Sequence, residues 1–188
     1  MQFQQLSILG LILIKPNVFG DNRGFFKETY NKEEFQKNGI NMEWIQDNHS
    51  RSIKGVLRGL HWQREPFAQD KLVRVARGTV LDVAVDIRVG SPTFGKYEAV
   101  ELSDENHNMF LVPKGFAHGF YVLSDIADFE YKVSSPYNKE SEAALFWNDP
   151  DIGVKWGVEG EPILSEKDQK NPLLKDIDID NLFKFVHK

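Results

Sequence analysis

Cysteine is absent from this chain of 188 residues. Disulfide bonds, thiolate metal ligands and cysteine nucleophiles are therefore excluded, and the packing of apolar side chains has to stabilise the fold. Methionine is scarce, with three residues, whereas phenylalanine is abundant, with 14. The composition, 41% hydrophobic and 27% charged, is that of a globular protein rather than a disordered one. At this length we expect one domain over residues 1–188.

Long apolar runs are missing as well. The apolar stretch near the start, Leu6–Ile14, is much shorter than the roughly 20 residues that cross a bilayer. No lysine or arginine precedes it and no small-residue cleavage site follows it, so it lacks the pattern of a signal peptide. We interpret this stretch as a strand, and we expect a cytoplasmic protein that does not bind membranes.

An excess of positive charge is also lacking, because the formal net charge is -5. Proteins that bind nucleic acids usually carry a basic surface, so we expect no nucleic-acid partner. The segment 51–77 reverses the balance, with seven basic and two acidic residues. Such a basic segment suits a small anionic ligand, because lysine and arginine form charge-assisted bonds to phosphate. A solvated charged strand face would have the same composition, and charge alone leaves both interpretations open.

Short strands separated by turn residues are the pattern found along most of the chain. In the clearest case, Leu72–Ala76 alternates, Arg77-Gly78 forms a turn, and the next strand has one apolar face made of Leu81, Val83, Val85 and Ile87. The opposite face could meet solvent or line a polar barrel interior; it carries Asp82, Ala84 and Asp86. We expect further strands at 97–102, 107–112, 118–123, 127–132 and 143–147. Many short strands favour a sandwich or barrel.

Helical signals are few. Asn31 can cap a helix over Asn31–Asn38, because Glu34 occupies the third helical position. Weaker helical signals lie in the polar C-terminal tail, at Ser165–Asp168 and Asp180–Val186. The sequence therefore predicts an all-β fold with a few short peripheral helices.

Two histidines are candidates for chemistry. His61 lies at the start of an apolar strand, three residues after Arg58. A strand histidine is usually structural, but imidazole is the side chain best suited to proton transfer near neutral pH. His118 ends the segment Pro113–His118, which resembles the second cupin motif, P-x-G-x-x-H.

In metal-dependent cupins, the histidine of that motif meets a first motif with His-x-His and a nearby glutamate. The corresponding stretch here is His61-Trp62-Gln63, so a glutamine replaces the second histidine. Two nitrogen ligands would leave a divalent metal under-coordinated. Glu65 could serve as a third ligand, which keeps a metal-dependent cupin dioxygenase as an alternative, but we expect no metal.

Two further features are weak when taken alone. Tyr131 lies near the end of an expected strand and could be an ordinary tyrosine with its hydroxyl group in water. The segment Ser165–Asp168 has the pattern of a helix start.

Taken together, these segments resemble the dTDP-4-dehydrorhamnose 3,5-epimerases, or RmlC family, of the cupin superfamily. The resemblance runs almost from end to end. It includes Asp21-x-Arg23-Gly24-x-Phe26-x-Glu28, Gln46–Ser50, Val56–Gln63, Lys71–Val75, Asp82–Arg88, Pro113–Phe120, Tyr131-Lys132 and Trp147–Pro150. It implies a cupin-type double-stranded β-helix, or jelly roll, that uses no metal and no cofactor.

The resemblance also implies roles for individual residues. His61 would be the proton acceptor, oriented by Asp168, and Tyr131 the proton donor, while Lys71 would face the keto oxygen. The substrate would be a dTDP-linked 4-keto-6-deoxyhexose. Its sugar, pyrophosphate and nucleoside would be held by Arg23, Glu28, Gln46, Asn48, Arg58, His118, Glu142 and Lys167.

The chemistry explains why such residues are needed. C3 and C5 flank the C4 ketone, so removal of either proton gives an enolate whose charge moves to the ketone oxygen. The expected reaction converts dTDP-4-dehydro-6-deoxy-D-glucose to dTDP-4-dehydro-L-rhamnose, in dTDP-L-rhamnose and polysaccharide biosynthesis. It needs a base, an acid on the opposite face and a donor at the oxyanion.

Other outcomes stay open. The same fold could epimerise one carbon or isomerise the ketone, and a sugar-nucleotide binder without activity would share the basic segment. Relatives implied by the resemblance are dimers, so we expect a homodimer, with the apolar segment Phe3–Ile14 as an interface element.

Overall fold

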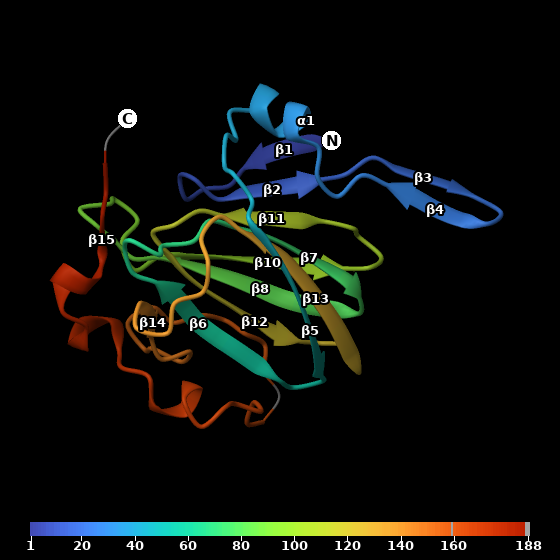
Figure 1. Ribbon diagram of the computed structural model, residues 1–188. Helices are drawn as coiled ribbons and strands as arrows, with labels where there is room; N and C mark the ends of the chain where they lie inside the picture. The colour runs from blue at the N-terminus through green and yellow to red at the C-terminus, as the bar shows by residue number, and fades with distance from the viewer. Residues whose placement is uncertain (159, 187–188) are drawn as a thin grey trace.

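The computed structural model describes residues 1–158 and 160–186. Two antiparallel sheets face each other in a sandwich (Figure 1). The six-stranded sheet has the order β1 (Gln2–Gln5), β2 (Ile12–Lys15), β11 (Met109–Val112), β7 (Lys71–Arg77), β13 (Ile126–Val133) and β5 (Gln46–Ile53). The five-stranded sheet has the order β10 (Tyr97–Ser103), β8 (Thr79–Asp86), β12 (Phe116–Val122), β6 (Leu57–Gln63) and β14 (Glu142–Ala144).

Smaller elements surround the sandwich. A hairpin of β3 (Val18–Asp21) and β4 (Gly24–Lys27) extends away from it (Figure 1), and β9 (Arg88–Val89) pairs in parallel with β15 (Phe183–Lys184). Within the described residues the helical elements are short: α1 (Lys32–Lys37) and the 3-10 turns η1 (Asp168–Lys170), η2 (Leu174–Asp176) and η3 (Ile179–Asn181). The prediction of an all-β sandwich of the cupin type with short peripheral helices is confirmed.

Aromatic side chains fill the space between the sheets. Phe120 on β12 stacks on Phe129 of β13, with ring centroids 4.2 Å apart, and so joins the two sheets. Phe110 and Phe116 belong to the same cluster and are almost completely buried. A stacked aromatic pair contributes about 0.5–1.5 kcal/mol beyond its buried area, so this contact fixes the spacing of the sheets.

The outer face of the five-stranded sheet is also covered. The segment after β14 returns over it, and Trp156 and Leu174 pack on apolar residues of β8 such as Val83 and Val85. Figure 1 shows this segment running beneath β6 and β12. As a result every residue of β12 is buried. A strand buried on both faces must carry apolar side chains on both, except where polar groups find partners.

The second face of β8 lines the barrel interior rather than meeting solvent. Asp82 and Asp86 are both 0% exposed. Asp86 accepts hydrogen bonds from Arg88, Ser91 and Thr93, which compensate the burial of its charge. Of the two interpretations that the sequence left open for this face, the polar interior is therefore the correct one.

Helix α1 forms where the sequence predicts it. The Asn31 side chain accepts a hydrogen bond from the backbone N–H of Glu34 at 3.3 Å, which caps the helix. Phe35 is the buried residue of the helix and packs against Ile14 and Leu72 on the outer face of the six-stranded sheet.

The interpretation of Leu6–Ile14 as one strand is wrong. The chain turns between β1 and β2, where Leu6 and Leu11 are joined by a backbone hydrogen bond of 2.9 Å. Gly10 has φ +104°, a left-handed conformation that glycine adopts without strain. Apolar composition alone did not reveal the turn, because Ile8 and Leu11 are buried within it.

The C-terminal predictions also need correction. Residues 180–186 are not a helix, because β15 pairs with β9 after the single turn η3. The helix start expected at Ser165–Asp168 is a 3-10 turn that begins at Asp168. The strand expected at 143–147 runs over Glu142–Ala144, because the chain turns at Trp147-Asn148. In each case tertiary packing decided between weak local preferences. In the described part of the chain, no helix is long and apolar enough to cross a membrane.

Phe110→Ala tests the core. Phe110 is 0% exposed, and truncation of such a buried phenylalanine costs about 3–5 kcal/mol, because it leaves a cavity. We expect this loss in the free energy of unfolding measured in urea. Leu9→Ala is the control, because Leu9 is 62% exposed and should change stability by less than about 0.5 kcal/mol. Equal losses in the two variants would contradict the assigned core.

Candidate functional site

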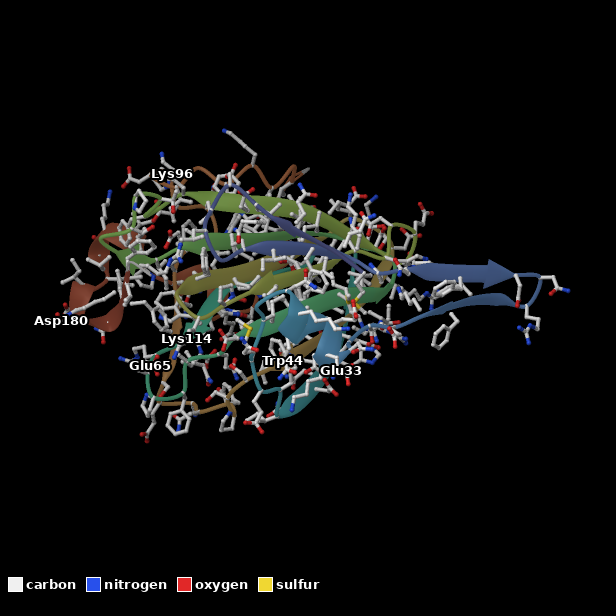
Figure 2. The ribbon with its side chains drawn as sticks, turned by 90° about the horizontal axis from the view of Figure 1, so that it is seen from above. Glu33, Trp44, Glu65, Lys96, Lys114 and Asp180 are labelled. Atoms are coloured by element: carbon white, nitrogen blue, oxygen red, sulfur yellow. The ribbon has the colours of Figure 1, made fainter. Side chains whose placement is uncertain are left out.

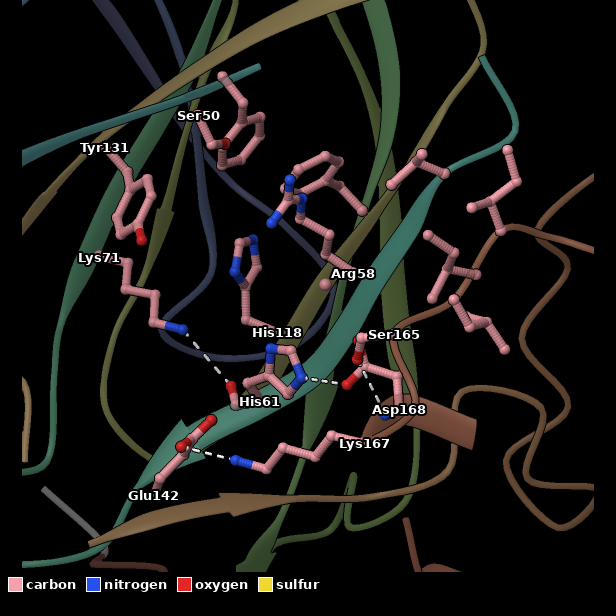
Figure 3. Close-up of a pocket in the computed structure, with 17 residues that line it drawn as sticks. Ser50, Arg58, His61, Lys71, His118, Tyr131, Glu142, Ser165, Lys167 and Asp168 are labelled. Carbon is pink, nitrogen blue, oxygen red and sulfur yellow. Dashed lines mark hydrogen bonds and ion pairs between the residues drawn. The ribbon is translucent and has the colours of Figure 1, made fainter. Parts of the chain in front are cut away.

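A cavity of about 490 Å³ lies between the two sheets and the C-terminal segment. Strands β5, β6, β7, β12, β13 and β14 contribute to its walls, together with residues 163–168. Its volume is within the range of about 300–1,000 Å³ that small-molecule sites occupy. Figure 3 shows how ionisable side chains from several of these strands point into it.

A bulge in β6 places two of these side chains on the same wall. In the pairing with β12, His61 is opposite His118 and Arg58 is opposite Phe120, so two residues of β6, Gly59 and Leu60, lie opposite one residue of β12. In a regular strand, residues three apart would face opposite sides, but one extra residue reverses the second. Arg58 and His61 consequently both line the cavity.

Two glycines allow this irregular pairing. A Cβ atom on Gly59 would lie 2.6 Å from the Cα atom of Gly119. A Cβ atom on Gly119 would lie 2.6 Å from the carbonyl oxygen of Arg58. The backbones of β6 and β12 are too close at this point for any side chain, so glycine is needed on both strands.

His61 forms a short contact with a carboxylate from the far end of the chain. The distance from His61 Nε2 to Asp168 Oδ1 is 2.5 Å, although the two residues are 107 positions apart. Burial raises the pKa of Asp168, but hydrogen bonds from His61, Ser165 and Asn171 outweigh it and hold the pKa below its ordinary value. The ionised carboxylate therefore fixes the Nε2–H tautomer and leaves Nδ1 of His61 to accept a proton.

Lys71 and Tyr131 approach the same space from the six-stranded sheet. The Nζ atom of Lys71 donates a hydrogen bond to the backbone carbonyl of His61 at 3.4 Å. Burial lowers the pKa of Lys71 to about 8, against the opposing charge of Asp82. Burial raises the pKa of Tyr131, against the opposing charge of Arg58, so its phenol is protonated at neutral pH. Base and phenol thus come from different sheets (Figure 3).

Glu142 and Lys167 form an ion pair at the edge of the cavity, with 2.6 Å between Lys167 Nζ and Glu142 Oε2. Tyr137 donates a further hydrogen bond to Glu142 at 3.0 Å. This pair joins β14 to the segment that carries Asp168, so it closes one side of the site beside the His61–Asp168 contact (Figure 3).

The cavity brings together most of the residues predicted from the sequence. Those that line it are Arg58, His61, Lys71, His118, Tyr131, Glu142, Lys167 and Asp168. Gln46 and Asn48 lie further out on β5, where Asn48 pairs directly with Tyr131 and Ser50 with Phe129. Directly paired residues share a face, so Gln46 and Asn48 extend the wall that Ser50 begins.

Arg23 and Glu28 are not part of this cavity. The Arg23 side chain is 84% exposed at the tip of the β3–β4 hairpin, where it pairs with Asp21. Glu28 accepts a hydrogen bond from Asn31 at 3.2 Å. The hairpin extends away from the sandwich in both views (Figures 1 and 2), so within one chain Arg23 at its tip does not reach the site. Glu28 follows β4 and is not among the residues that line the cavity.

Some residues that line the cavity, and one buried directly behind it, were not predicted from the sequence. Ser50 and Ser165 line the walls, but serines in polar segments carry no signal of their own. Asp82 is buried behind His118, with 2.8 Å between His118 Nε2 and Asp82 Oδ1. Asp82 could have been found because it is an aspartate in a largely apolar strand. Such an aspartate needs a hydrogen-bond partner if its side chain faces inwards.

The basic segment 51–77 contains residues of both kinds that its charge allowed: some face the cavity, where an anionic ligand could bind, and others lie on the charged face of a strand. Arg58 and Lys71 line the cavity. Arg51 and Arg74 instead pair with Asp128 and Glu130 across the six-stranded sheet. Two of the seven basic residues therefore face the cavity, and two others form ion pairs on the sheet surface.

The side chain of Gln63 bears directly on the metal-dependent alternative. Its amide nitrogen donates to the carbonyl oxygens of Phe67 and Pro136, and its amide oxygen accepts from the N–H of Asn138. It therefore anchors two loops and has no atom free for a metal. The Nε2 atoms of His61 and His118 are each engaged by a carboxylate. The donor atoms present do not fit a first-row metal site.

A second hollow, of about 1340 Å³, lies beside the C-terminal residues 180–186. Figure 2 shows Glu65, Lys114 and Asp180 at this end of the molecule. Several of its charged groups are engaged by neighbours: Lys114 pairs with Glu65 at 3.0 Å, and Arg64 donates to the carbonyl oxygen of Glu140. It is larger than the first cavity, but the described residues that line it include no base with an orienting carboxylate, so the smaller cavity is the candidate active site.

Comparison with known proteins gives a consistent result. The family model described as dTDP-4-dehydrorhamnose 3,5-epimerase matches residues 5–176. The dTDP-4-dehydrorhamnose 3,5-epimerase of Shigella flexneri is 50% identical over 179 residues, which are 95% of this chain and 98% of that protein.

Solved structures agree with the sequence comparison. The dTDP-6-deoxy-D-glucose-3,5-epimerase RmlC of Legionella pneumophila Philadelphia 1, in complex with dTDP-4-keto-L-rhamnose, superposes with a TM-score of 0.96. It is 46% identical and covers 99% of both chains. ChmJ, a 3'-monoepimerase from Streptomyces bikiniensis, superposes with a TM-score of 0.90 at 34% identity, over 95% of this chain and 91% of that one. Sequence, fold and cavity agree that this chain belongs to the dTDP-4-dehydrorhamnose 3,5-epimerase family.

Proposed function

We propose that this chain epimerises dTDP-4-dehydro-6-deoxy-D-glucose at C3 and C5 and produces dTDP-4-dehydro-L-rhamnose. The observation that carries the proposal is the contact of His61 with Asp168 in a cavity that Lys71 and Tyr131 also line. Relatives with about 50% sequence identity are named for this activity, and the Legionella structure is a complex with dTDP-4-keto-L-rhamnose. The enzyme is an isomerase.

His61 is the proposed base. Its Nδ1 atom takes the proton from C3 or C5, and the bonding electrons move through the new C–C double bond to the C4 oxygen. Asp168 stabilises the imidazolium that results. Protonated Lys71 stabilises the negative charge on the oxygen, as an oxyanion donor does. General base catalysis of this kind contributes about 10²–10⁴-fold.

Tyr131 is the proposed acid. It returns a proton to the opposite face of the same carbon, which inverts the centre and restores the ketone, and solvent then exchanges protons with both residues. Its location on β13, in the sheet opposite His61, gives the two faces that inversion requires. Its raised pKa keeps the proton on the phenol until the enolate forms.

The remaining cavity residues suit the rest of the substrate. Arg58 is held by a hydrogen bond from its Nε atom to Ser52 at 3.0 Å, and its guanidinium group points into the cavity (Figure 3). We assign it to the pyrophosphate. His118, Glu142 and Lys167 would contact the sugar or nucleoside from the cavity walls, and Gln46 and Asn48 would do so from its edge.

Arg23 and Glu28 fit this scheme only if a second copy supplies them. The β3–β4 hairpin exposes Phe19, Phe25 and Phe26 as well as Arg23, which is unusual for a surface that stays in water. We therefore propose a homodimer in which each hairpin reaches the partner's site. The expected interface segment Phe3–Ile14 is less suited to this role, because Leu11 and Ile14 are buried in their own chain.

Epimerisation of a single carbon is the second candidate function. The observation that favours it is the likeness to ChmJ, a 3'-monoepimerase. Isomerisation of the ketone, binding without turnover and metal-dependent oxidation stay weaker alternatives, because they do not require the complete set of base, orienting carboxylate, acid and lysine. A cytoplasmic location stays a prediction.

Deuterium exchange tests the proposed reaction. In ²H₂O with dTDP-4-dehydro-6-deoxy-D-glucose, we expect NMR to show deuterium at both C3 and C5 of the sugar. His61→Ala should reduce the rate by about 10²–10⁴-fold, because it removes the base. Exchange at one carbon would favour the mono-epimerase, and no exchange by the unmodified protein would refute the proposal.

Asp168→Asn tests the orienting carboxylate. The amide keeps the size of the side chain but does not hold the Nε2–H tautomer, so we expect kcat to fall by about 10²–10⁴-fold with little change in KM. Asp151→Asn is the matched control, because that carboxylate is exposed and lies outside the cavity. A kcat within twofold of the unmodified enzyme would show that Asp168 does not orient the base.

The dimer is tested by light scattering, which should give twice the chain mass of 21.6 kDa. Arg23→Ala should raise KM without dissociating the dimer, because the side chain would contact substrate across the interface. A monomer with full activity would contradict both assignments.

A further inference from the structure

The carboxylate of Asp82 is a buried charged group that the reaction described above does not use. It lies on the inner face of β8, is 0% exposed and is not part of the cavity surface. One oxygen, Oδ1, is 2.8 Å from His118 Nε2. In the described part of the chain the other oxygen, Oδ2, has no hydrogen-bond partner. An ionisable group placed so deeply is costly unless nearby positive charge compensates it.

Ionisable groups line the cavity from five of its six strands and from the C-terminal segment. They are Arg58 and His61 on β6, Lys71 on β7, His118 on β12, Tyr131 on β13, Glu142 on β14, and Lys167 and Asp168 in the C-terminal segment. Two of the carboxylates are already paired, Glu142 with Lys167 and Asp168 with His61. Asp82 contacts His118 through Oδ1, and its Oδ2, unpartnered among the described residues, leaves it as the buried carboxylate whose charge can act on Lys71.

The electrostatics agree with this assignment. Burial lowers the pKa of Lys71 to about 8, and the charge of Asp82 is what opposes that fall. Burial raises the pKa of Asp82, and the charges of His118 and Lys71 oppose that rise. Burial likewise lowers the pKa of His118. Each of the three groups thus affects the charge state of the other two.

We propose that Asp82 is a positioning residue, which keeps Lys71 protonated beside the keto oxygen and holds His118 in the Nε2–H tautomer. Asp82 itself does not touch the substrate. It acts through its two neighbours: Lys71 keeps the charge that an enolate oxygen needs, and His118 offers an unprotonated Nδ1 atom to a hydroxyl group. The inference rests on the proposed epimerase function.

Asp82→Asn separates this role from a structural one. Protonated Lys71 is the active form, so activity is present below its pKa and is lost as pH rises through it. Removal of a neighbouring negative charge lowers the pKa of the lysine by roughly one unit or more. We expect the alkaline limb of the pH profile of kcat to shift to lower pH by that amount, with KM changed less than twofold. Asp128→Asn, on the outer face of β13, is the control and should leave the limb in place.

Two measurements do not depend on turnover. The pH dependence of Lys71 acetylation by acetic anhydride, read by mass spectrometry, should give a pKa near 8 that falls in Asp82→Asn. In the unmodified protein, ¹⁵N NMR should show His118 with its proton on Nε2. Because the NMR measurement uses the unmodified protein, it tests the proposal even if Asp82→Asn does not fold.

The outcomes are distinct. A lower Lys71 pKa and a shifted alkaline limb support the proposal. An unchanged Lys71 pKa overturns it, even if kcat falls at every pH, because such a fall would mean only a structural role. A His118 proton on Nδ1 also overturns it. If the unmodified protein shows no exchange, the proposed function fails, but the acetylation and NMR results still decide whether Asp82 controls its neighbours.

Discussion

Burial of the outer face of the five-stranded sheet by the C-terminal segment is the constraint on which the site depends. Apolar residues of β8 and β12 need a cover, and Trp156 and Leu174 provide it. The same segment carries Asp168 to within 2.5 Å of His61. Hydrophobic packing therefore brings the carboxylate of Asp168 to His61, although the two residues are 107 positions apart.

The interior of the sandwich combines two requirements that conflict. Its aromatic core excludes water, which strengthens every charge interaction at the site but makes each unpaired charge costly. The structure resolves the conflict by pairing: Asp168 with His61, Glu142 with Lys167, and Asp82 with His118. Lys71 is left without so close a partner, and it is the residue proposed to meet negative charge that appears only during the reaction.

The backbone of β6 shows why sequence spacing alone could not give the geometry. A regular strand would point Arg58 and His61 to opposite faces, and the bulge opposite β12 brings them to one. The glycine pair that permits it, Gly59 and Gly119, lies on two different strands. The importance of each glycine becomes visible only when the strands are adjacent.

The sequence by itself determined the fold class and the cap of α1, because alternation and capping residues are local properties of the chain. The eight predicted residues that line the cavity came from the resemblance to the epimerase family. The sequence did not determine the turn inside Leu6–Ile14, the strand at Phe183–Lys184 or the inward direction of Asp82, because each depends on what packs against that segment. The tertiary structure alone separated Arg58 and Lys71 from the arginines that pair on the sheet surface. It also showed that neither Arg23 nor Glu28 lines the cavity of its own chain, and that Arg23 lies on a hairpin that extends away from the sandwich.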